Sequence, residues 1–216
     1  MSLVAVIDYG MGNLRSVAKA LEHVNPRARV KITADANDIR AADHLVFPGQ
    51  GAIGAAMTAL RQRDLDHILL QEMGKKPFLG ICLGLQVMMD FSEEDGGTQG
   101  LGLLPGKVVR FPKPHIDPVS HERLKVPHMG WNQCHQSQSH PLWSGIEQDS
   151  RFYFVHSYYV TTDDPNEIAG TCQYGLNFVA AACRDNMFAV QFHPEKSAQA
   201  GLKLLENFLQ WDGQSA

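Results

Sequence analysis

The chain has 216 residues, a length that fits one large domain. Its 19 basic and 23 acidic residues give a net charge of −4, and the basic residues are scattered along the sequence. Because phosphate binding needs a basic surface, this composition argues against a nucleic-acid-binding protein. No apolar stretch approaches the ~18 residues that a membrane-spanning helix needs, so we expect no membrane association.

The cysteines and the N-terminal residues indicate a reducing compartment. None of the four cysteines are spaced as C-x-x-C, which argues against a zinc ribbon, and four are too few for a disulfide framework in a chain of this size. The first residues, MSLVAVIDYG, lack the basic segment of a signal peptide. The segment GMGN (10–13) begins like a dinucleotide-binding fingerprint, but Arg15 stands where the third glycine would be. We therefore expect a cytoplasmic protein with no metal and no cofactor.

Short apolar runs and amphipathic segments alternate in the first half of the chain, a pattern typical of a parallel sheet with helical crossovers. The expected strands cover residues 3–10, 28–33, 44–49 and 77–81, and the expected helices cover residues 13–24, 35–42, 52–73 and 83–91. Asn13 is the expected N-cap of the first helix. In such sheets the chemistry lies at the carboxyl ends of the strands, where this chain carries the glycine-rich loops DYGMGN, FPGQGAIG and GICLG.

After about residue 95 the sequence becomes rich in loops and prolines, and strand-like runs with short turns follow. The expected strands here cover residues 151–160, 167–174, 178–184 and 187–192. Asp185 and Asn186 are the expected turn of a hairpin. An amphipathic helix over residues 197–212 closes the chain. No linker divides the two halves, so we expect a single domain over residues 1–216.

Cys82 lies between two glycines at the point where a strand pattern changes to a helix pattern. G-x-C-x-G in this setting is the nucleophile-elbow pattern with sulfur in place of oxygen. A sharp turn there exposes the thiol at the top of the sheet, at the start of a helix whose positive end favours a thiolate. The alternative is a small, buried core residue, which is what most free cysteines are, and for Cys134, Cys172 and Cys183 we retain that interpretation.

A nucleophilic thiol needs a base, and the base needs a group that orients it. His193 follows the apolar run MFAVQF and so lies at a strand end, and Glu195 is two residues further on. In an extended chain, residues i and i+2 point the same way, so the carboxylate can hold the imidazole in one tautomer. The alternative is that His-Pro-Glu forms an ordinary surface turn.

The loop FPGQGAIG (47–54) is a candidate for a second wall of the site. It leaves the third strand with glycines at 49, 51 and 54, and such a loop can present a backbone N–H to an oxyanion. The alternative is a tight turn that only leads into the next helix.

GICLGLQ together with QFHPEKS resembles the class I (triad-type) glutamine amidotransferase family. DYGMGNLRSV, FPGQGA, PHMGWN (127–132) and YFVHSY (153–158) extend this resemblance over residues 4–209. The resemblance implies an α/β three-layer sandwich of flavodoxin-like type, with a central, mostly parallel sheet and a smaller antiparallel sheet. It also implies a glutaminase, which hydrolyses L-glutamine to glutamate and ammonia.

The resemblance implies a role for each residue that matches a family motif. Cys82 would attack the amide carbon of glutamine, His193 would protonate the leaving ammonia and then activate water, and Glu195 would orient His193. Backbone amides would hold the oxyanion; they belong to Leu83, Gly49, Gln50 and Gly51, although Gln50 stands where a small apolar residue is expected. The residues that match substrate-binding positions are Gln86, Glu94, His156, Ser157 and Tyr158.

A partner is implied because ammonia is useful in biosynthesis only if it meets an acceptor, and this chain has no spare domain for an acceptor site. PHMGWN and YGMGN resemble a branch of the family in which the glutaminase is a separate subunit that works in histidine biosynthesis. Its partner there is a cyclase that folds as a (β/α)8 barrel, and the two form a heterodimer. Asn13, Met129 and Trp131 are the expected contacts, since Trp and Met are enriched in interfaces. The alternative for Trp131 is a core position in the smaller sheet.

Two other functions stay open on the sequence. One is a glutaminase of the same family that serves guanylate, anthranilate or pyridoxal phosphate synthesis. The other is a regulatory or scaffold protein that kept the fold without catalysis, although intact Cys82, His193 and Glu195 argue against it.

Overall fold

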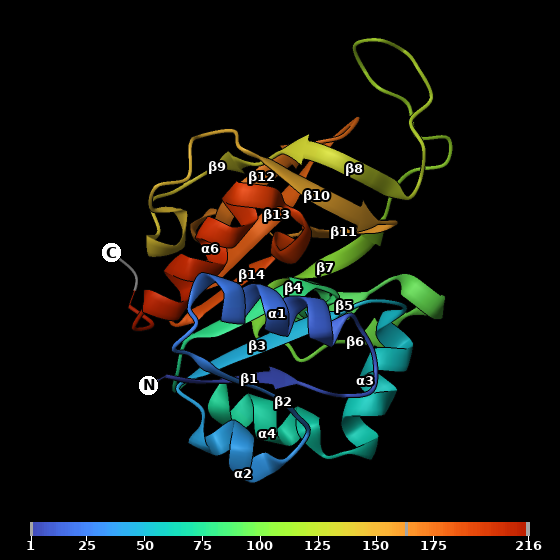
Figure 1. Ribbon diagram of the computed structural model, residues 1–216. Helices are drawn as coiled ribbons and strands as arrows, with labels where there is room; N and C mark the ends of the chain where they lie inside the picture. The colour runs from blue at the N-terminus through green and yellow to red at the C-terminus, as the bar shows by residue number, and fades with distance from the viewer. Residues whose placement is uncertain (1, 163, 215–216) are drawn as a thin grey trace.

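Five parallel strands form the half of the sheet that carries the site (Figure 1). The structure is a computed structural model that describes residues 2–162 and 164–214. The strands lie in the order β2 (Arg29–Thr33), β1 (Leu3–Ile7), β3 (His44–Gly49), β4 (Phe78–Cys82) and β14 (Met187–Val190). This is the doubly wound, flavodoxin-like order, in which successive crossovers turn back at β1 and place helices on both faces.

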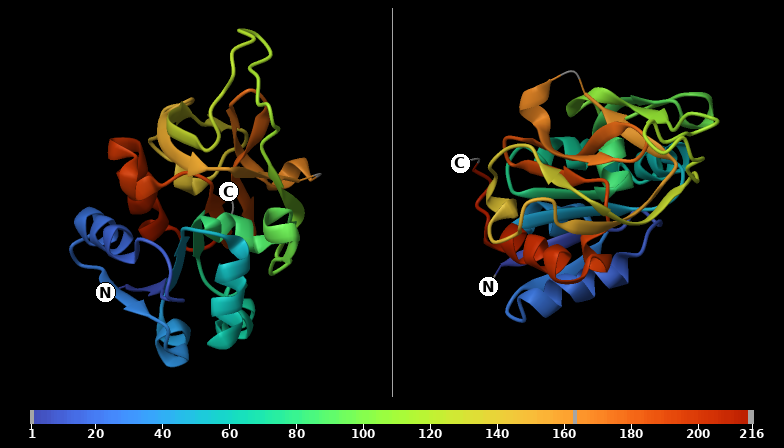
Figure 2. Two further views of the ribbon diagram at one scale, coloured as in Figure 1. Left: turned by 90° about the vertical axis from the view of Figure 1, so that its right-hand side faces the viewer. Right: turned by 90° about the horizontal axis from the view of Figure 1, so that it is seen from above.

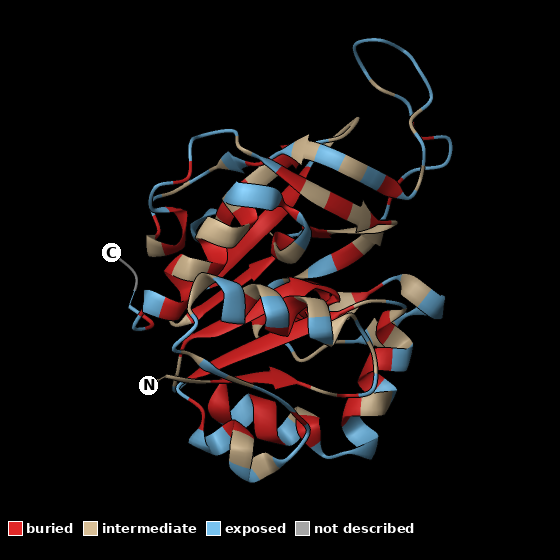
Figure 3. Cartoon of the chain, viewed as in Figure 1, coloured by how far each residue is buried: buried red, intermediate tan, exposed pale blue. Residues whose placement is uncertain are grey.

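Helices cover both faces of these strands, as expected for three layers. On one face lie α1 (Leu14–Val24) and α6 (Ala198–Gln210), and on the other lie α2 (Ala36–Ala41), α3 (Ile53–Gln62), α4 (Leu65–Glu72) and α5 (Leu83–Met88). Side chains of β1 alternate between two buried clusters, with Val4 and Val6 in one and Ala5 and Ile7 in the other. The inner strands β1, β3 and β4 and the neighbouring β14 are therefore buried on both faces (Figure 3), whereas the edge strand β2 is largely exposed.

Beyond β14 the pairing becomes mainly antiparallel. The strands of this part are β5 (Met89–Ser92), β6 (Thr98–Gln99), β7 (Leu104–Arg110), β9 (His135–Gln136), β11 (Tyr158–Thr161), β12 (Ile168–Gln173) and β13 (Asn177–Arg184). A separate two-stranded sheet pairs β8 (His128–Gln133) with β10 (Arg151–His156). Short 3-10 turns cover Glu94–Gly96, Pro141–Trp143, Pro165–Glu167 and Pro194–Lys196. The predicted fold class, a mostly parallel central sheet with a smaller antiparallel one, is confirmed.

Three element predictions were wrong, one because of a local backbone conformation and two because tertiary pairing overrides the local pattern. The helix expected over 52–73 is two helices, since Asp64 between them adopts a left-handed conformation with φ 57°. The helix expected over 83–91 ends at Met88, because Met89 leaves in an extended conformation and pairs with β7. The single strand expected over 151–160 divides at Ser157, so that β10 pairs with β8 while β11 pairs with β7 and β13.

Other local predictions can be compared directly with the structure. The hairpin is present, with Arg184 paired to Met187 across the predicted turn. Asn13 does occupy the N-cap position of α1, but its side chain makes no capping hydrogen bond. Strands β7 and β8 lie in the proline-rich region that the sequence indicated as loop, and the segment between them projects from the body (Figures 1 and 2). Among the described residues, no helix is long and apolar enough to cross a bilayer.

The junction of β4 and α5 is packed so closely that it requires a glycine. A Cβ added to Gly84 would lie 2.1 Å from the backbone oxygen of Phe47 on β3. No side-chain rotation can relieve that overlap, because the atom it meets is main chain. The absence of a side chain at residue 84 therefore lets α5 start directly against the sheet.

We predict that Gly84→Ala lowers the free energy of unfolding by about 3 kcal/mol, as overpacking of a core does. Gly74→Ala is the matched control, because an added Cβ there meets nothing within 4 Å, and it should change stability by less than about 0.5 kcal/mol. Urea unfolding followed by circular dichroism measures both variants. Equal stabilities of the two variants would contradict this account of the junction.

Candidate active site

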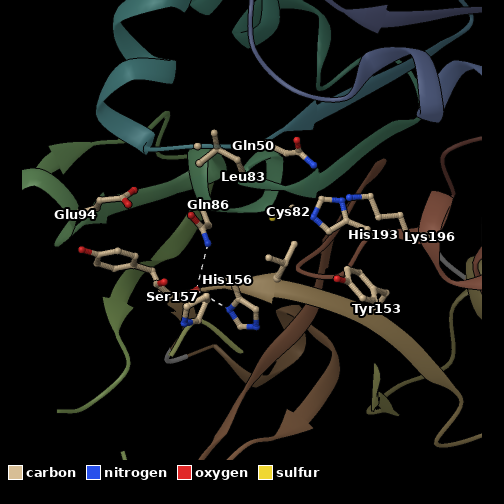
Figure 4. A pocket seen from close by; sticks show the side chains of 14 residues that line it. Gln50, Cys82, Leu83, Gln86, Glu94, Tyr153, His156, Ser157, His193 and Lys196 are labelled. Carbon is tan, nitrogen blue, oxygen red and sulfur yellow. Dashed lines mark hydrogen bonds between the residues drawn. The ribbon is translucent and has the colours of Figure 1, made fainter. Parts of the chain in front are cut away.

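Cys82 is the last residue of β4 and turns the chain sharply into α5. Its backbone has φ 56° and ψ −105°, a conformation that residues other than glycine rarely adopt. The side chain is buried apart from a 7% exposed fraction, and it lines a cavity at the carboxyl edge of the sheet (Figure 4). This strained strand-to-helix turn is the elbow geometry that presents a nucleophile.

His193 reaches the same place from the neighbouring strand. β14 pairs in parallel with β4, with Val190 beside Ile81, so the residues that follow both strands emerge at one edge. Figure 4 shows the imidazole next to Cys82. The Nδ1 atom of His193 lies 2.9 Å from Oε1 of Glu195, and both side chains are at most 2% exposed.

The expected partnership of His193 and Glu195 is present, but the reason given for it was wrong. Glu195 does not continue an extended strand, because Pro194–Lys196 forms a 3-10 turn. The turn, which Pro194 begins, brings the carboxylate within hydrogen-bond distance of Nδ1 of the imidazole. A turn of this kind and a strand both bring residues i and i+2 within reach, so the sequence alone did not distinguish them.

The side chains around His193 raise its pKa by more than burial lowers it. Burial lowers the pKa of this imidazole, but the Cys82 side chain and the Glu195 carboxylate raise it, and together they bring the pKa of His193 to about 10. The Nε2 atom makes no hydrogen bond of regular geometry within the described part of the chain, although Cys82 is close enough to act on its charge. An imidazole with this pKa carries a proton at neutral pH, which it can give to a leaving group beside Cys82.

The cavity has a volume of about 460 Å³ and gathers most of the expected site residues (Figure 4). The predicted residues that line it are Gln50, Gly51, Cys82, Leu83, Gln86, Glu94, His156, Ser157, Tyr158 and His193. Gly49 and Glu195 do not line it. They lie behind the imidazole in a closely packed niche that also contains Asn13.

The expected oxyanion segment divides between these two places. Gln50 and Gly51 face the cavity, as does Leu83, the residue after the elbow. Gly49 is the last residue of β3, where it pairs with Cys82, and a Cβ added to it would lie 2.4 Å from the Tyr9 hydroxyl. Gly49 therefore supports the elbow from behind and allows close packing there. The Tyr9 hydroxyl is buried without a hydrogen-bond partner among the described residues, and its pKa is raised by burial and then by the charge of Cys82.

The far wall of the cavity is built from polar side chains that are held in place. Gln86 donates to the backbone oxygen of Tyr158 at 3.3 Å, and His156 also contacts that oxygen, at 2.8 Å. Glu94 accepts a hydrogen bond from the backbone N–H of Ile53 at the start of α3, 2.9 Å away. Burial raises the pKa of Glu94 above its ordinary value.

Sequence reasoning missed three polar residues in or beside the site. Tyr153 and Lys196 line the cavity, and the Lys196 ammonium lies 5.9 Å from the centre of the Tyr153 ring. Gln191 is fully buried, and its amide nitrogen lies 3.6 Å from the sulfur of Cys82. Its signal in the sequence was a polar side chain at the end of an otherwise apolar run, MFAVQF.

The residues expected at a partner interface lie in two settings. Met129 and Trp131 share the outward face of β8 and are 63% and 44% exposed. Trp131 packs edge-on against Tyr153, with ring centroids 6.3 Å apart, so it is not the core residue that the alternative supposed. Asn13 lies in the niche behind the triad.

Comparison with known proteins identifies the family. Residues 5–211 match the family described as glutamine amidotransferase class-I. The chain belongs to this family. It is 55% identical over 215 residues to a protein of Nitrosococcus oceani named imidazole glycerol phosphate synthase subunit HisH, with 100% of both chains covered. It is also 55% identical, over 98% of both chains, to the protein of the same name from Hydrogenovibrio crunogenus.

Solved structures agree on the fold. A structure of PurLQS from Thermotoga maritima superposes with a TM-score of 0.72 at 18% identity, covering 97% of this chain and 99% of the other. A crystal structure described as glutamine amidotransferase has a TM-score of 0.70 at 16% identity, with 96% of this chain and 97% of the other covered. At this identity the likeness concerns the fold alone.

Proposed function

We propose that the chain is the glutaminase subunit of an imidazole glycerol phosphate synthase. The observation that carries the proposal is the elbow cysteine, Cys82, next to the imidazole of His193 in a cavity of suitable size. Glu195 contacts that imidazole at Nδ1, and Cys82 and Glu195 together raise its pKa. The identity of more than half to relatives named as HisH subunits, over the whole chain, supports the choice of synthase. The whole chain acts as one glutamine amidotransferase domain, in the cytoplasm.

In this mechanism the Cys82 sulfur attacks the side-chain amide carbon of L-glutamine. The tetrahedral oxyanion that forms is held by the backbone N–H of Leu83 and by the Gln50–Gly51 segment, which follows the adjacent strand β3. His193 gives its proton to the departing nitrogen, which leaves as ammonia, and a thioester remains. His193 then takes a proton from water, the hydroxide attacks the thioester, and glutamate is released as the sulfur regains its charge.

The remaining site residues orient His193 or hold the substrate. Glu195 keeps Nδ1 of His193 engaged, so that Nε2 faces the sulfur. Gln86, Glu94 and the segment 156–158 line the part of the cavity that receives the amino-acid end of the substrate. Each step moves only protons and an acyl group, so the chemistry requires neither a metal nor an organic cofactor.

The ammonia goes to a cyclase of (β/α)8-barrel fold, which forms a heterodimer with this chain. That partner uses it to make imidazole glycerol phosphate and aminoimidazole carboxamide ribotide in histidine biosynthesis. The outward face of β8 with Met129 and Trp131 is the partner contact, because two large apolar side chains stand exposed there next to a cavity-lining residue, Tyr153.

The two alternatives predict different behaviour. A glutaminase of another pathway would bind a different synthase and would not support histidine synthesis. A scaffold without catalysis would not need a charged, buried imidazole beside a strained cysteine. The full-length relatives favour histidine biosynthesis over the first alternative, and the site favours an enzyme over the second.

We predict that Cys82→Ala abolishes glutamine-dependent synthesis by the complex but leaves synthesis from added ammonium salts within about twofold of wild type. The reason is that the thiol is needed only to release ammonia, while the cyclase consumes it. Product formation is measured with each nitrogen source in turn. Loss of both activities in a folded variant would mean that the cysteine is structural.

We predict that Trp131→Ala weakens the complex with the cyclase by at least tenfold in Kd, which is the effect of a buried aromatic anchor. Leu70→Ala is the matched control, since Leu70 is also 44% exposed but lies on α4, far from β8 (Figure 1). Isothermal titration with the cyclase measures both affinities. If the two variants bind equally well, β8 is not the interface.

A further inference from the structure

Gln191 is a fully buried amide that the mechanism above does not use. It follows β14 directly, and its backbone N–H is fixed by the oxygen of Ala180 at 2.8 Å. Its side-chain nitrogen donates to the Cys82 sulfur at 3.6 Å, within the range of hydrogen bonds to sulfur. An amide can donate or accept according to its orientation, so something must hold the N–H toward the sulfur.

A chain of hydrogen bonds fixes that orientation. Gln86 donates one hydrogen to the backbone oxygen of Tyr158 at 3.3 Å and the other to Oε1 of Gln191 at 3.1 Å. Because the Gln191 oxygen already accepts from Gln86, its nitrogen is left to face Cys82. Figure 4 draws the hydrogen bond from Gln86 to the backbone oxygen of Tyr158, which also accepts a hydrogen bond from His156.

The same series of hydrogen bonds continues away from the cavity to β8. A carbonyl can only accept, so Nδ1 of His156 carries the hydrogen of that bond and Nε2 accepts one from Nδ1 of His128, 2.9 Å away. The Nε2 of His128 then accepts from the Asn132 amide at 3.3 Å. Burial lowers the pKa of His128 to about 4 and that of His156 to about 3, so both rings are neutral, as this pattern requires.

We propose that Gln191 is a positioning residue for the nucleophile: its amide N–H holds the Cys82 sulfur as a thiolate, and the chain from His128 through His156 and Gln86 holds the amide. An N–H aimed at sulfur stabilises the charged form over the thiol. The inference rests on the proposed role of Cys82 as nucleophile. It adds a donor that acts on the sulfur itself, whereas Glu195 acts only through His193.

The test is the pH dependence of Cys82 alkylation by iodoacetamide, followed by mass spectrometry on the full chain without glutamine. Gln191→Met keeps the volume and removes the donor, so the pH of half-maximal rate should rise by about one unit. Gln191→Glu places a carboxylate there and should raise it further. The other titratable groups around the sulfur are kept in both variants: His193 and Tyr9, whose charges couple to Cys82, Glu195 behind the imidazole, and Glu94, His156 and Lys196 in the cavity wall.

Gln138→Met is the matched control, because the Gln138 amide donates to another buried thiol, that of Cys183, at 3.4 Å, and it should leave the Cys82 profile unchanged. His128→Phe tests the series of hydrogen bonds at its far end, away from Cys82. It keeps the stacking of residue 128 on Tyr174, whose ring centroid is 4.0 Å away, but removes the hydrogen bonds, and it should raise the midpoint by a smaller amount. It also keeps the test available if the Gln191 variants do not fold.

Unchanged midpoints in folded Gln191 variants would overturn the proposal, and an unchanged midpoint in His128→Phe would overturn the part that concerns the chain. His193→Ala separates these failures from failure of the proposed function. If His193→Ala also leaves the profile unchanged, Cys82 is not the activated nucleophile. If His193→Ala moves the midpoint and Gln191→Met does not, only the role of Gln191 is wrong.

Discussion

The parallel pairing of β4 with β14 is the constraint on which the site depends. Cys82 and His193 lie far apart in the sequence, and nothing local holds them together. The register that sets Ile81 beside Val190 brings the ends of both strands to one edge of the sheet. A slip by one residue would exchange the two faces of the strand and move both side chains away from each other. The sulfur and the imidazole therefore meet only if this pairing is correct.

The site costs stability, which the surrounding fold supplies. Cys82 has a backbone conformation that costs on the order of 1–3 kcal/mol, and a buried imidazolium and carboxylate lose their hydration. The two apolar clusters on either side of β4 fix the strand so firmly that the strained turn persists. Burial also strengthens the interaction of His193 with Glu195 and Cys82, because fewer water molecules screen it. The same rigidity that stores the strain makes the charged groups effective.

Much of the fold and of the triad could be predicted from the sequence, since apolar runs, glycines and the two motifs are local signals. Part of what failed depended on partners distant in the chain, and part on the backbone conformation of a single residue. Met89 has a helical pattern but pairs with β7, and Asp64 interrupts a continuous apolar period by its own conformation. Gln191 was missed because a single polar residue at a strand end does not reveal which atom it faces. Its contact with Cys82 follows from the register of β14 and β4, and that register is not a property of either segment alone.

The most direct test of the account is covalent labelling by an electrophilic glutamine analogue, with peptide mass spectrometry to locate the adduct. Cys134, Cys172 and Cys183 serve as internal references, because burial raises the pKa of each of these thiols. The account predicts that Cys82 alone among the four is modified, that L-glutamine protects it, and that replacing His193 slows the reaction by orders of magnitude. Modification of all four cysteines at similar rates, with no protection by glutamine, would contradict it.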